Sequence, residues 1–412
     1  MRVLHVTASL SQRHGGPTTA VLGMCKALVR RGVEVILLAP NVEIMGGWLA
    51  TRPRQLLDVR VGRLAREEGI EIRFFETQWP HKYLVSMDLV RQLNELLPTI
   101  DVVHIHSVYR FTTIATARYA RKFGVPYIIR PHGTYDDYLM RGRRVPKTIY
   151  HFMLEKYYLD RASAIHFTSE SELSQARKLR IRSRGAVVPL GLDSPNYLGD
   201  KERFLAKHPV LQEKRLIVFL GRITRKKGLD LLVDAFATLA AASSDLQLVI
   251  AGPDDSGFRN TIERQIRDRG IAARTTWLGM VSGREKWDLL AAANVWVLPS
   301  YTENFGLAVV EALAAGAPVV ISDQVAIHDL LSQANAAVVV ECNADQLATA
   351  MGHVLDDADL RNSLIRNGPR TVAASFSWDA AASKLLKLYR QVVVESNANK
   401  RSHGHTQSGS RS

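Results

Sequence analysis

The chain has 412 residues, of which 46% are hydrophobic and 23% charged, and only two are cysteines. This composition excludes collagen-like, low-complexity and disulfide-stapled proteins, and no apolar run reaches the roughly 18 residues that a membrane-spanning helix needs. The formal net charge is +14, and residues 1–193 hold 29 Lys and Arg against 17 Asp and Glu, so the excess lies in the first half.

Residues 1–193 alternate short apolar segments, typical of buried strands, with amphipathic segments, typical of helices. The helical patterns include Thr18–Arg31 and Met87–Leu97. Apolar strands separated by helices predict a parallel sheet that is covered on both faces. The expected strands are Val3–Thr7, Glu34–Ala39, Ile70–Phe75, Val102–His106, Tyr127–Arg130, Ala164–Thr168 and Ala186–Pro189.

A polar segment, residues 194–212, breaks the alternation and is expected to be a linker. The alternation resumes in residues 213–378, which predicts a second doubly wound domain. Residues 379–395 are expected to form a last helix, and residues 396–412 a disordered polar tail. The strands expected in the second domain are Leu216–Leu220, Leu246–Ala251, Thr275–Leu278, Val295–Leu298, Pro318–Ser322 and Ala337–Val340.

Two features bear on where the chain works. The strand Val3–Thr7 follows Met1 almost directly, and no secretory signal is visible in this sequence. Cys25 and Cys342 lie in distant halves and form no metal-binding pattern, which fits a reducing compartment. We therefore expect a cytoplasmic protein. Its basic first half favours an anionic partner, and a merely solvated basic surface is an equal alternative.

In open parallel sheets, ligands bind beyond the carboxyl ends of the strands. Strand Val295–Leu298 leads into a loop with Glu303, and the following helix carries Glu311 about two turns further on. The start of this helix is an expected anion site, because its first N–H groups have no partner within the helix. A loop acid that only stabilises the helix dipole is an equal alternative. The N–H groups concerned are those of Asn304, Phe305 and Gly306.

Strand Leu216–Leu220 ends in a basic loop that runs from Gly221 to Gly228. A guanidinium fork from Arg222, an ammonium group from Lys227 and backbone N–H groups would suit a diphosphate. The loop lacks the spacing of a P-loop. A solvated basic turn is the alternative, although it does not explain the flanking glycines. In the loop after Thr275–Leu278, Val281 would line a base pocket through backbone contacts, and an ordinary turn with an N-cap at Ser282 is an equal alternative.

The first half offers two weaker elements. A Gly15-Gly16 pair opens the helix after the first strand and would let the backbone approach a ligand, although a tight structural turn is an equal alternative. The pattern is not G-x-G-x-x-G, which disfavours a dehydrogenase. Strand Tyr127–Arg130 ends in His132-Gly133, where the imidazole would reach a bound sugar or acceptor. A buried structural histidine is the alternative.

His104 and His106 would point the same way from their strand, as metal ligands do. No third ligand is apparent in the sequence, so we expect a structural role or a place at the edge of the substrate site, and no metal site. Arg141, Arg143 and Arg144 precede a segment with aromatic residues at helical spacing, which would suit an anionic membrane surface. A helix packed in the core is the more common explanation. No nucleic-acid recognition motif is present, and we expect no nucleic-acid partner.

Four elements stand in order along the chain: Gly15-Gly16, His132-Gly133, Gly221-Arg222-x4-Lys227-Gly228 and Glu303-x7-Glu311. With these elements the chain resembles the retaining glycosyltransferases of family 4, the group 1 glycosyltransferases. The resemblance spans about residues 1–395. It implies the α/β fold named GT-B, with two Rossmann-like, doubly wound parallel-sheet domains facing a central cleft. Residues 1–193 would bind the acceptor, residues 213–378 the nucleotide sugar, and residues 379–395 would cross back to the first domain.

The resemblance also implies roles for single residues. Arg222 and Lys227 would hold the donor diphosphate, and Glu311 the ribose hydroxyls. Glu303 and His132 would be the catalytic residues at the reacting centre. Neither a cofactor nor a metal ion would be required, since the nucleotide sugar is a substrate. The N–H groups of Asn304, Phe305 and Gly306 would hold the donor sugar together with Glu303, and Gly16 would lie near the phosphates and the acceptor when the cleft closes.

The leading hypothesis is a hexosyltransferase that moves a sugar from a UDP- or GDP-sugar to a lipid-linked or polysaccharide acceptor, in cell-surface polysaccharide biosynthesis. The basic first domain suggests peripheral contact with the inner face of an anionic membrane. Two alternatives remain on the same fold. A nucleotide-sugar epimerase would consume the donor without an acceptor, and a non-catalytic binding module would bind the nucleotide without turnover.

Overall fold

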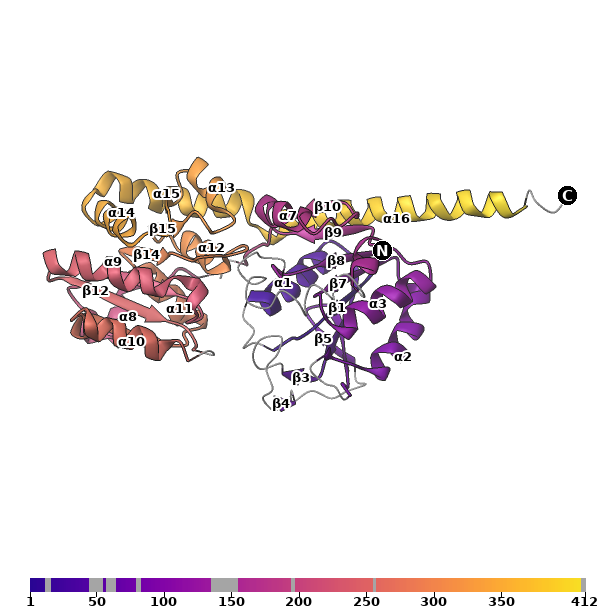
Figure 1. The fold of residues 1–412 in the computed structure, drawn as a ribbon, viewed down its shortest axis with the longest axis horizontal. Coiled ribbons are helices and arrows are strands. Elements are labelled where there is room, and N and C mark those ends of the chain that lie inside the picture. Colours follow the sequence, from indigo (N-terminus) through magenta and orange to yellow (C-terminus); the bar gives the residue numbers. More distant parts are fainter. Residues whose placement is uncertain are drawn as a thin grey trace. The chain divides into compact units, whose positions relative to one another are not determined.

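The computed structural model describes residues 1–11, 16–43, 55–56, 64–78, 83–134, 155–193, 197–254 and 257–408. The chain divides into two compact units (Figure 1). Unit 1 comprises Met1–Gly191 and Trp378–Ser412, and unit 2 comprises Leu192–Ser377. The expected domain limits at residues 193 and 378 lie within two residues of the points where the chain passes from one unit to the other.

Unit 1 is built on an eight-stranded sheet with the order β10-β9-β8-β7-β1-β2-β6-β5. Seven of these strands are parallel, as expected, and β5 pairs antiparallel with β6 at the edge. A separate antiparallel pair joins β3 (Val42–Glu43) to β4 (Gln55–Leu56). The sequence did not predict β3, β4 or β5. The sheet strands are β1 (Arg2–Thr7), β2 (Glu34–Pro40), β5 (Leu64–Glu67), β6 (Ile70–Phe75), β7 (Val102–His106), β8 (Tyr127–Arg130), β9 (Ala164–Phe167) and β10 (Gly185–Val187).

Helices cover this sheet because its strands are largely apolar and bury nearly all of their residues. On one face, Leu4 and Val6 of β1 share a buried core with the helices between β6 and β8. That core includes Leu89 and Leu93. The helices of unit 1 are α1 (Gly16–Arg30), α2 (Met87–Leu96), η3 (Leu97–Thr99), α3 (Phe111–Lys122), α6 (Lys156–Leu159), α7 (Glu170–Arg177) and α16 (Trp378–Ser408).

The opposite face of β1 and β7 carries a buried group of histidines, because successive side chains of a strand alternate between faces. The register places His5 directly opposite His104. His5 Nδ1 lies 2.8 Å from His106 Nε2, and His104 Nδ1 lies 2.6 Å from the hydroxyl of Tyr389 on α16. Nitrogens of His5, His104 and His106 lie within 4.8 Å of one another. Strand pairing thus brings in His5, about 100 residues away in the chain, as a third histidine that was not apparent from the sequence.

These imidazoles form a neutral hydrogen-bonded network. Burial is the main cause that lowers the pKa of His5 to about 3, and the nearby guanidinium of Arg130 lowers it further. Burial and neighbouring charges also hold the pKa values of His104 and His106 well below 6.5. Arg130 is itself only 2% exposed. A fixed positive charge there would oppose a divalent cation, so the geometry favours a structural network over a metal site.

Mild acid is expected to destabilise unit 1. The unfolded chain binds protons on histidine near pH 6.5, whereas the buried histidines do not, so the unfolded state gains protons first as the pH falls. Each buried histidine should then cost up to about 1.4 kcal/mol of unfolding free energy per pH unit below about 6.5. Urea unfolding at pH 7.5, 6.5 and 5.5 measures this slope. Replacing His5 by Gln should reduce the slope, whereas the same change at the exposed His353 should not. A midpoint that stays constant from pH 7.5 to 5.5 would contradict the prediction.

Unit 2 is built on a six-stranded, fully parallel sheet with the order β13-β12-β11-β14-β15-β16. The chain runs outward from β11 in one direction, then returns to β14 and runs outward in the other, which is the doubly wound order expected from the sequence. The strands are β11 (Arg215–Leu220), β12 (Leu246–Ala251), β13 (Thr275–Gly279), β14 (Val295–Leu298), β15 (Val319–Ser322) and β16 (Val338–Val340). The helices are α8 (Lys201–Lys207), η5 (Pro209–Leu211), η6 (Arg225–Lys227), α9 (Leu229–Ala242), α10 (Arg259–Asp268), η7 (Ala272–Arg274), α11 (Gly283–Ala292), α12 (Leu307–Ala314), α13 (His328–Gln333), α14 (Ala344–Asp356) and α15 (Ala358–Ser375).

The segment expected to be a linker, residues 194–212, is instead largely part of unit 2. It contains α8 and η5, and Phe204 of α8 is 1% exposed. Arg203 Nε donates a 2.6 Å hydrogen bond to the buried carboxylate of Asp288 on α11. The partner of Arg203 lies 85 residues away in the chain. The polar composition of residues 194–212 therefore does not reveal that this segment packs against unit 2.

The tail expected to be disordered from residue 396 is helical as far as Ser408, since α16 is continuous from Trp378. Tyr389 and Val392 bury their side chains in unit 1 and so anchor the first half of this helix. Once a helix is nucleated, each further residue adds a hydrogen bond at little cost, so a polar continuation can extend it. Among the described residues, none of the helices is both long enough and apolar enough to cross a membrane.

Candidate functional site

Two loops of unit 2 meet at the point where the strand order reverses. Strands β11 and β14 are direct neighbours, with Val218 paired to Trp296. The loop after β11 runs from Gly221 to Gly228, and the loop after β14 leads to α12. Backbone contact joins them, because Tyr301 N–H donates a 2.8 Å hydrogen bond to the carbonyl of Lys226. The structure therefore brings together the two segments that the sequence analysis singled out separately.

The Lys227 ammonium group and the Glu303 carboxylate form an ion pair between these loops. Both side chains are nearly buried, at 11% and 13% exposed. Burial alone would raise the pKa of Glu303, but the positive charges of Lys227, Lys226 and Arg222 outweigh it and lower this pKa to about 2. Glu303 is therefore ionised at neutral pH, and Arg222 lies close enough to act on it. One carboxylate and three cations share this edge of the sheet.

Arg222 differs from Lys227 in its surroundings. Its side chain is exposed, and within the described part of the chain no ion pair or hydrogen bond engages its guanidinium. A guanidinium in this position can accept an anion without breaking an existing contact. Lys227, by contrast, can reach a new anion only while it shares or releases Glu303.

The start of α12 has the free amide groups that the sequence analysis expected. Gly306 caps the helix with φ +79°, a left-handed conformation that favours glycine. In the described structure, the N–H groups of residues 304–306 donate to no other group. The Phe305 ring is buried and packs edge-on against Phe376 at 5.5 Å, which anchors the loop in the core. The amides of Asn304, Phe305 and Gly306 are thus held in place and have no acceptor within the described structure, as the amides of an anion site would.

Glu311 on α12 forms a second ion pair that the sequence analysis missed. Lys286 Nζ on α11 donates a 2.7 Å hydrogen bond to Glu311 Oε1, and both side chains are about one-fifth exposed. Val281 lies in the connection between β13 and α11, so the same helix that carries Lys286 also starts beside the expected base pocket. The sequence around Lys286 does not indicate this contact, because Glu311 belongs to the next strand–helix unit.

Replacing Lys286 by methionine is expected to weaken the binding of UDP or GDP by roughly 5- to 30-fold, since a charge-assisted hydrogen bond that orients Glu311 is lost. Calorimetric titration of the nucleotide and of its 2′,3′-dideoxy analogue measures the effect. Because Glu311 is expected to bind the ribose hydroxyls, removing those hydroxyls should cost the variant less than the wild type. Lys286→Arg should restore most of the difference. If removing the ribose hydroxyls lowers the affinity of the wild type and of the variant equally, this role of Lys286 is contradicted.

In unit 1, His132 lies at the carboxyl end of β8, as expected. Its backbone has φ +55°, a left-handed conformation that costs a non-glycine residue about 1–2 kcal/mol. Its ring centroid is 5.5 Å from that of His106. Burial, Arg130 and His166 hold the pKa of His132 well below 6.5, so this imidazole is neutral near pH 7. A neutral imidazole can accept a proton or donate a hydrogen bond to a hydroxyl group.

Glu172 holds this strained turn in place, and the sequence analysis did not identify it. Its carboxylate accepts hydrogen bonds from Gly133 N–H at 2.9 Å and from Thr168 N–H at 2.8 Å. It is 5% exposed and lies at the start of α7. Because a buried carboxylate fixes the residue next to His132, the conformation of the turn is built into the fold.

The other element expected in unit 1 is only partly described. Gly16 is the first residue of α1 and is exposed. Gly15 lies outside the described residues, as do Arg141, Arg143 and Arg144. The described structure nevertheless places Gly16 and His132 after β1 and β8 respectively, at the carboxyl edge of one parallel sheet.

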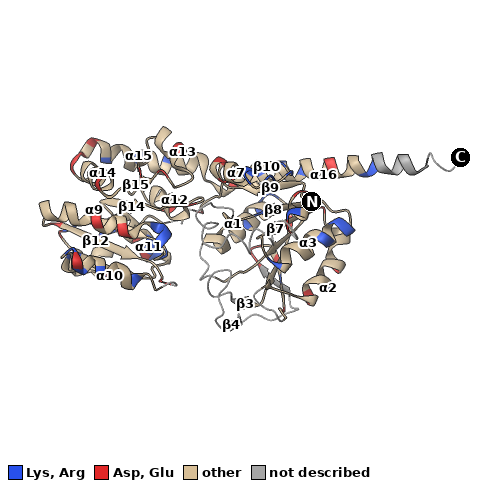
Figure 2. Cartoon of the chain, in the orientation of Figure 1, with Lys and Arg blue, Asp and Glu red and all other residues tan. Residues whose placement is uncertain are grey.

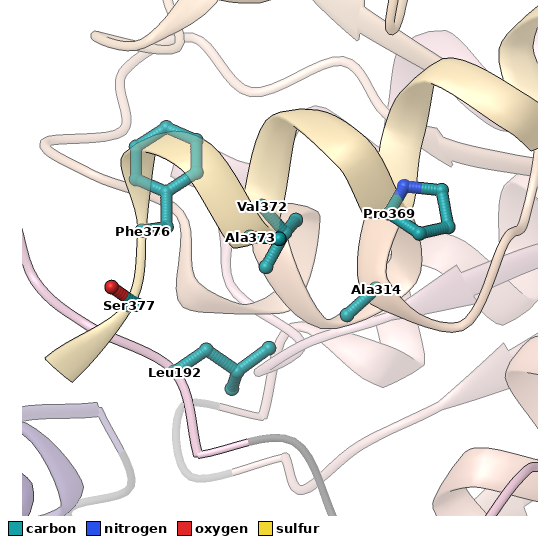
Figure 3. Close-up of a pocket in the computed structure, with 7 residues that line it drawn as sticks. All are labelled: Leu192, Ala314, Pro369, Val372, Ala373, Phe376 and Ser377. Atoms are coloured by element: carbon teal, nitrogen blue, oxygen red, sulfur yellow. The ribbon is translucent and has the colours of Figure 1, made fainter. Parts of the chain in front are cut away.

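A small apolar cavity in unit 2 is separate from these charged loops. Figure 3 shows its lining, which includes Leu192, Pro369, Val372 and Phe376, and its volume is about 130 Å³. No charged side chain lines it, so it offers nothing to hold a diphosphate. The candidate anion site of unit 2 therefore rests on the loops after β11 and β14.

Comparison with known proteins gives two matches to family models. Residues 15–191 match the glycosyl transferase 4-like domain, and residues 200–371 match glycosyl transferases group 1. An uncharacterized glycosyltransferase of Methanocaldococcus jannaschii is 31% identical over 400 residues, which cover 91% of this chain and 94% of the relative. The D-inositol 3-phosphate glycosyltransferase of Mycobacterium tuberculosis is 27% identical over 412 residues, covering 95% of this chain and 82% of that enzyme.

Solved structures show the same fold. Sucrose-phosphate synthase from Thermosynechococcus elongatus superposes with a TM-score of 0.74 at 21% identity, covering 96% of this chain and all of that one. HepE from Anabaena, solved with UDP and glucose, gives a TM-score of 0.71 at 14% identity, covering 95% of this chain and all of that one.

Proposed function

The chain belongs to the group 1 glycosyltransferases of family 4, with the GT-B fold, and from this premise we propose that it transfers a hexose from a UDP- or GDP-sugar, with retention of configuration, to a lipid-linked or polysaccharide acceptor. The observation that carries the proposal is the ion pair between Lys227 and Glu303 at the strand-reversal point of unit 2, with Arg222 in the same loop as Lys227. Relatives solved with UDP or UDP-glucose support a nucleotide-sugar donor.

Unit 2 would bind the donor. The donor diphosphate would lie against Arg222, Lys227 and the amides of residues 304–306, which carry positive charge or donate hydrogen bonds. When the bond between the sugar and the diphosphate breaks, negative charge grows on the departing phosphate. These groups are fixed before the reaction, so they stabilise that charge at little reorganisation cost. Arg222 and Lys227 would supply the charge that a metal ion supplies elsewhere, so no metal ion or cofactor would be needed.

Glu303 would stabilise the sugar. The transition state of such a transfer has oxocarbenium character, which a nearby ionised carboxylate favours. The low pKa of Glu303, about 2, would keep it ionised throughout the working pH range. We favour displacement on one face of the sugar, in which the leaving phosphate takes the proton of the acceptor hydroxyl as that hydroxyl attacks. In this step one glycosidic bond forms, one sugar–phosphate bond breaks, and the proton leaves with the nucleoside diphosphate.

Unit 1 would bind the acceptor, with His132 directed at its hydroxyl group. Residues 1–191 carry 29 Lys and Arg against 16 Asp and Glu, and residues 378–412 carry six against two. Unit 1 therefore has a formal charge of +17, and unit 2 of −3, out of the total of +14. Such a basic unit would suit a phosphate-bearing lipid acceptor and peripheral contact with the inner face of an anionic membrane, in the biosynthesis of a cell-surface polysaccharide.

A panel of UDP- and GDP-sugars tests the proposal. The true donor should raise the unfolding temperature of the purified chain, because it binds only the native state. Radiolabel from that donor should then appear in a lipid or polysaccharide fraction only when acceptor extract is present, with the anomeric configuration retained. An isomerised sugar without acceptor would indicate an epimerase, and nucleotide binding without turnover would indicate a binding module. Either outcome would contradict the proposed transfer.

A further inference from the structure

Unit 1 has a basic cavity between the end of α1 and the first turns of α16, of about 660 Å³. It is lined by Arg31, Ser383, Lys384, Leu386, Lys387 and Arg390. Arg31 lies just before β2 begins at Glu34, at the amino edge of the sheet. His132 and Gly16, which serve the proposed reaction, follow the carboxyl ends of strands. The cavity therefore has no part in the proposed catalytic chemistry.

The cations of this cavity are largely unneutralised. Arg31 donates to the carboxylate of Asp379 at 2.7 and 3.0 Å. Within the described residues, no ion pair involves Lys384, Lys387 or Arg390, and all three are exposed. They lie three residues apart along α16, so they project to one side of the helix. Lys and Arg on α16 are blue in Figure 2. With Arg31 paired to Asp379, the other three cations around this opening still create an attraction for phosphate groups.

The side chains that line the cavity suit the mobile headgroups of a membrane better than a single soluble phosphate compound. A site that recognises one soluble phosphate uses fixed donors such as backbone N–H groups. Here the backbone N–H groups of residues 383–390 donate hydrogen bonds within α16. Among the described residues that line the cavity, Ser383 is the only one with a hydroxyl group. Flexible lysines suit headgroups that vary in position. Val394, which is 67% exposed, lies four residues after Arg390 and so continues the same face with an apolar group.

We propose that this cavity and the adjoining face of α16 dock unit 1 on the headgroups of an anionic phospholipid membrane. This inference rests on the membrane contact included in the proposed function and assigns that contact to named residues, Arg31, Lys384, Lys387 and Arg390. Sugar transfer to a detergent-solubilised acceptor does not depend on it, so the two ideas can fail separately.

Flotation with vesicles of phosphatidylcholine alone, or with 30 mol% phosphatidylglycerol, tests the proposal on the full chain. The wild type should bind only the anionic vesicles, and more weakly at 500 mM salt than at 50 mM. The triple variant Lys384→Gln, Lys387→Gln and Arg390→Gln should bind roughly 10- to 100-fold more weakly. A control variant, Lys201→Gln, Arg264→Gln and Arg267→Gln, removes three exposed charges from unit 2 and should bind like the wild type.

Three outcomes would overturn the proposal: no binding by the wild type, equal weakening in both variants, or unchanged binding by the triple variant. A further arm uses inorganic pyrophosphate and inositol hexakisphosphate in place of vesicles. If these bind the wild type but not the triple variant, while vesicle binding is the same for both, the cavity takes a soluble anion and not a membrane. An unchanged thermal shift with UDP or GDP would show that the triple variant is folded and that donor binding is intact.

Discussion

Replacing Lys227 by methionine is expected to lower kcat/KM for the donor by roughly 100- to 1,000-fold, which is the usual effect of removing one pre-oriented charge-stabilising group. Lys227 is the cation bound to Glu303, and both are nearly buried. Its loss should also destabilise unit 2 by roughly 3 kcal/mol, since Glu303 would keep its charge without its closest partner. Steady-state kinetics and urea unfolding of the same variant measure the two effects.

Arg222→Met is the matched comparison, because it removes the same charge from the same loop. Arg222 is exposed and has no ion-pair partner within the described residues, so its loss should slow the reaction by a similar factor but leave stability nearly unchanged. The pKa of Glu303 should rise in both variants, and more in Lys227→Met, since Lys227 is the larger cation contribution to its low value. Wild-type kinetics in both variants would refute the assignment of these cations to the diphosphate.

The second large effect is expected from Gly228→Ala. Gly228 has φ +67° and joins η6 to α9, directly after Lys227. A methyl group there would overlap the carbonyl oxygen of Pro299, at the end of β14. The left-handed backbone would cost about 1–2 kcal/mol and the displacement of β14 or its loop a further 1–3 kcal/mol. Since the two loops carry Lys227 and Glu303, activity should fall together with stability.

Gly270→Ala is the control for this prediction. Gly270 also belongs to unit 2 and has φ +70°, but no atom lies within 4 Å of the position that its methyl group would take. It should therefore show only the backbone cost and keep full activity. The difference in unfolding free energy between the two variants isolates the contact with Pro299. If both variants lose the same stability, and both keep kcat, the close packing of the two loops does not matter.

The sequence determined the alternation of strands and helices, and with it the two parallel-sheet domains. A strand buried on both faces is mostly apolar, so Leu216–Leu220 and Val295–Leu298 could be recognised without tertiary information. Since parallel strands end at a common edge, the polar loops after Leu220 and Leu298 also pointed to one site. Spacing along the chain was sufficient for these inferences because each depends on residues close together in sequence.

Only the tertiary structure decided which distant side chains meet. Lys227 binds Glu303 across 76 residues, and Lys286 binds Glu311 across 25. His5 joins the other buried histidines through strand register, and Arg203 draws the expected linker into unit 2 through Asp288. Such contacts leave no periodic trace, because the strand order, rather than the spacing in sequence, sets the distance between the partners. The sequence thus predicted the fold and the loops that form the site. The charge state and the orientation of the site residues depend on tertiary packing.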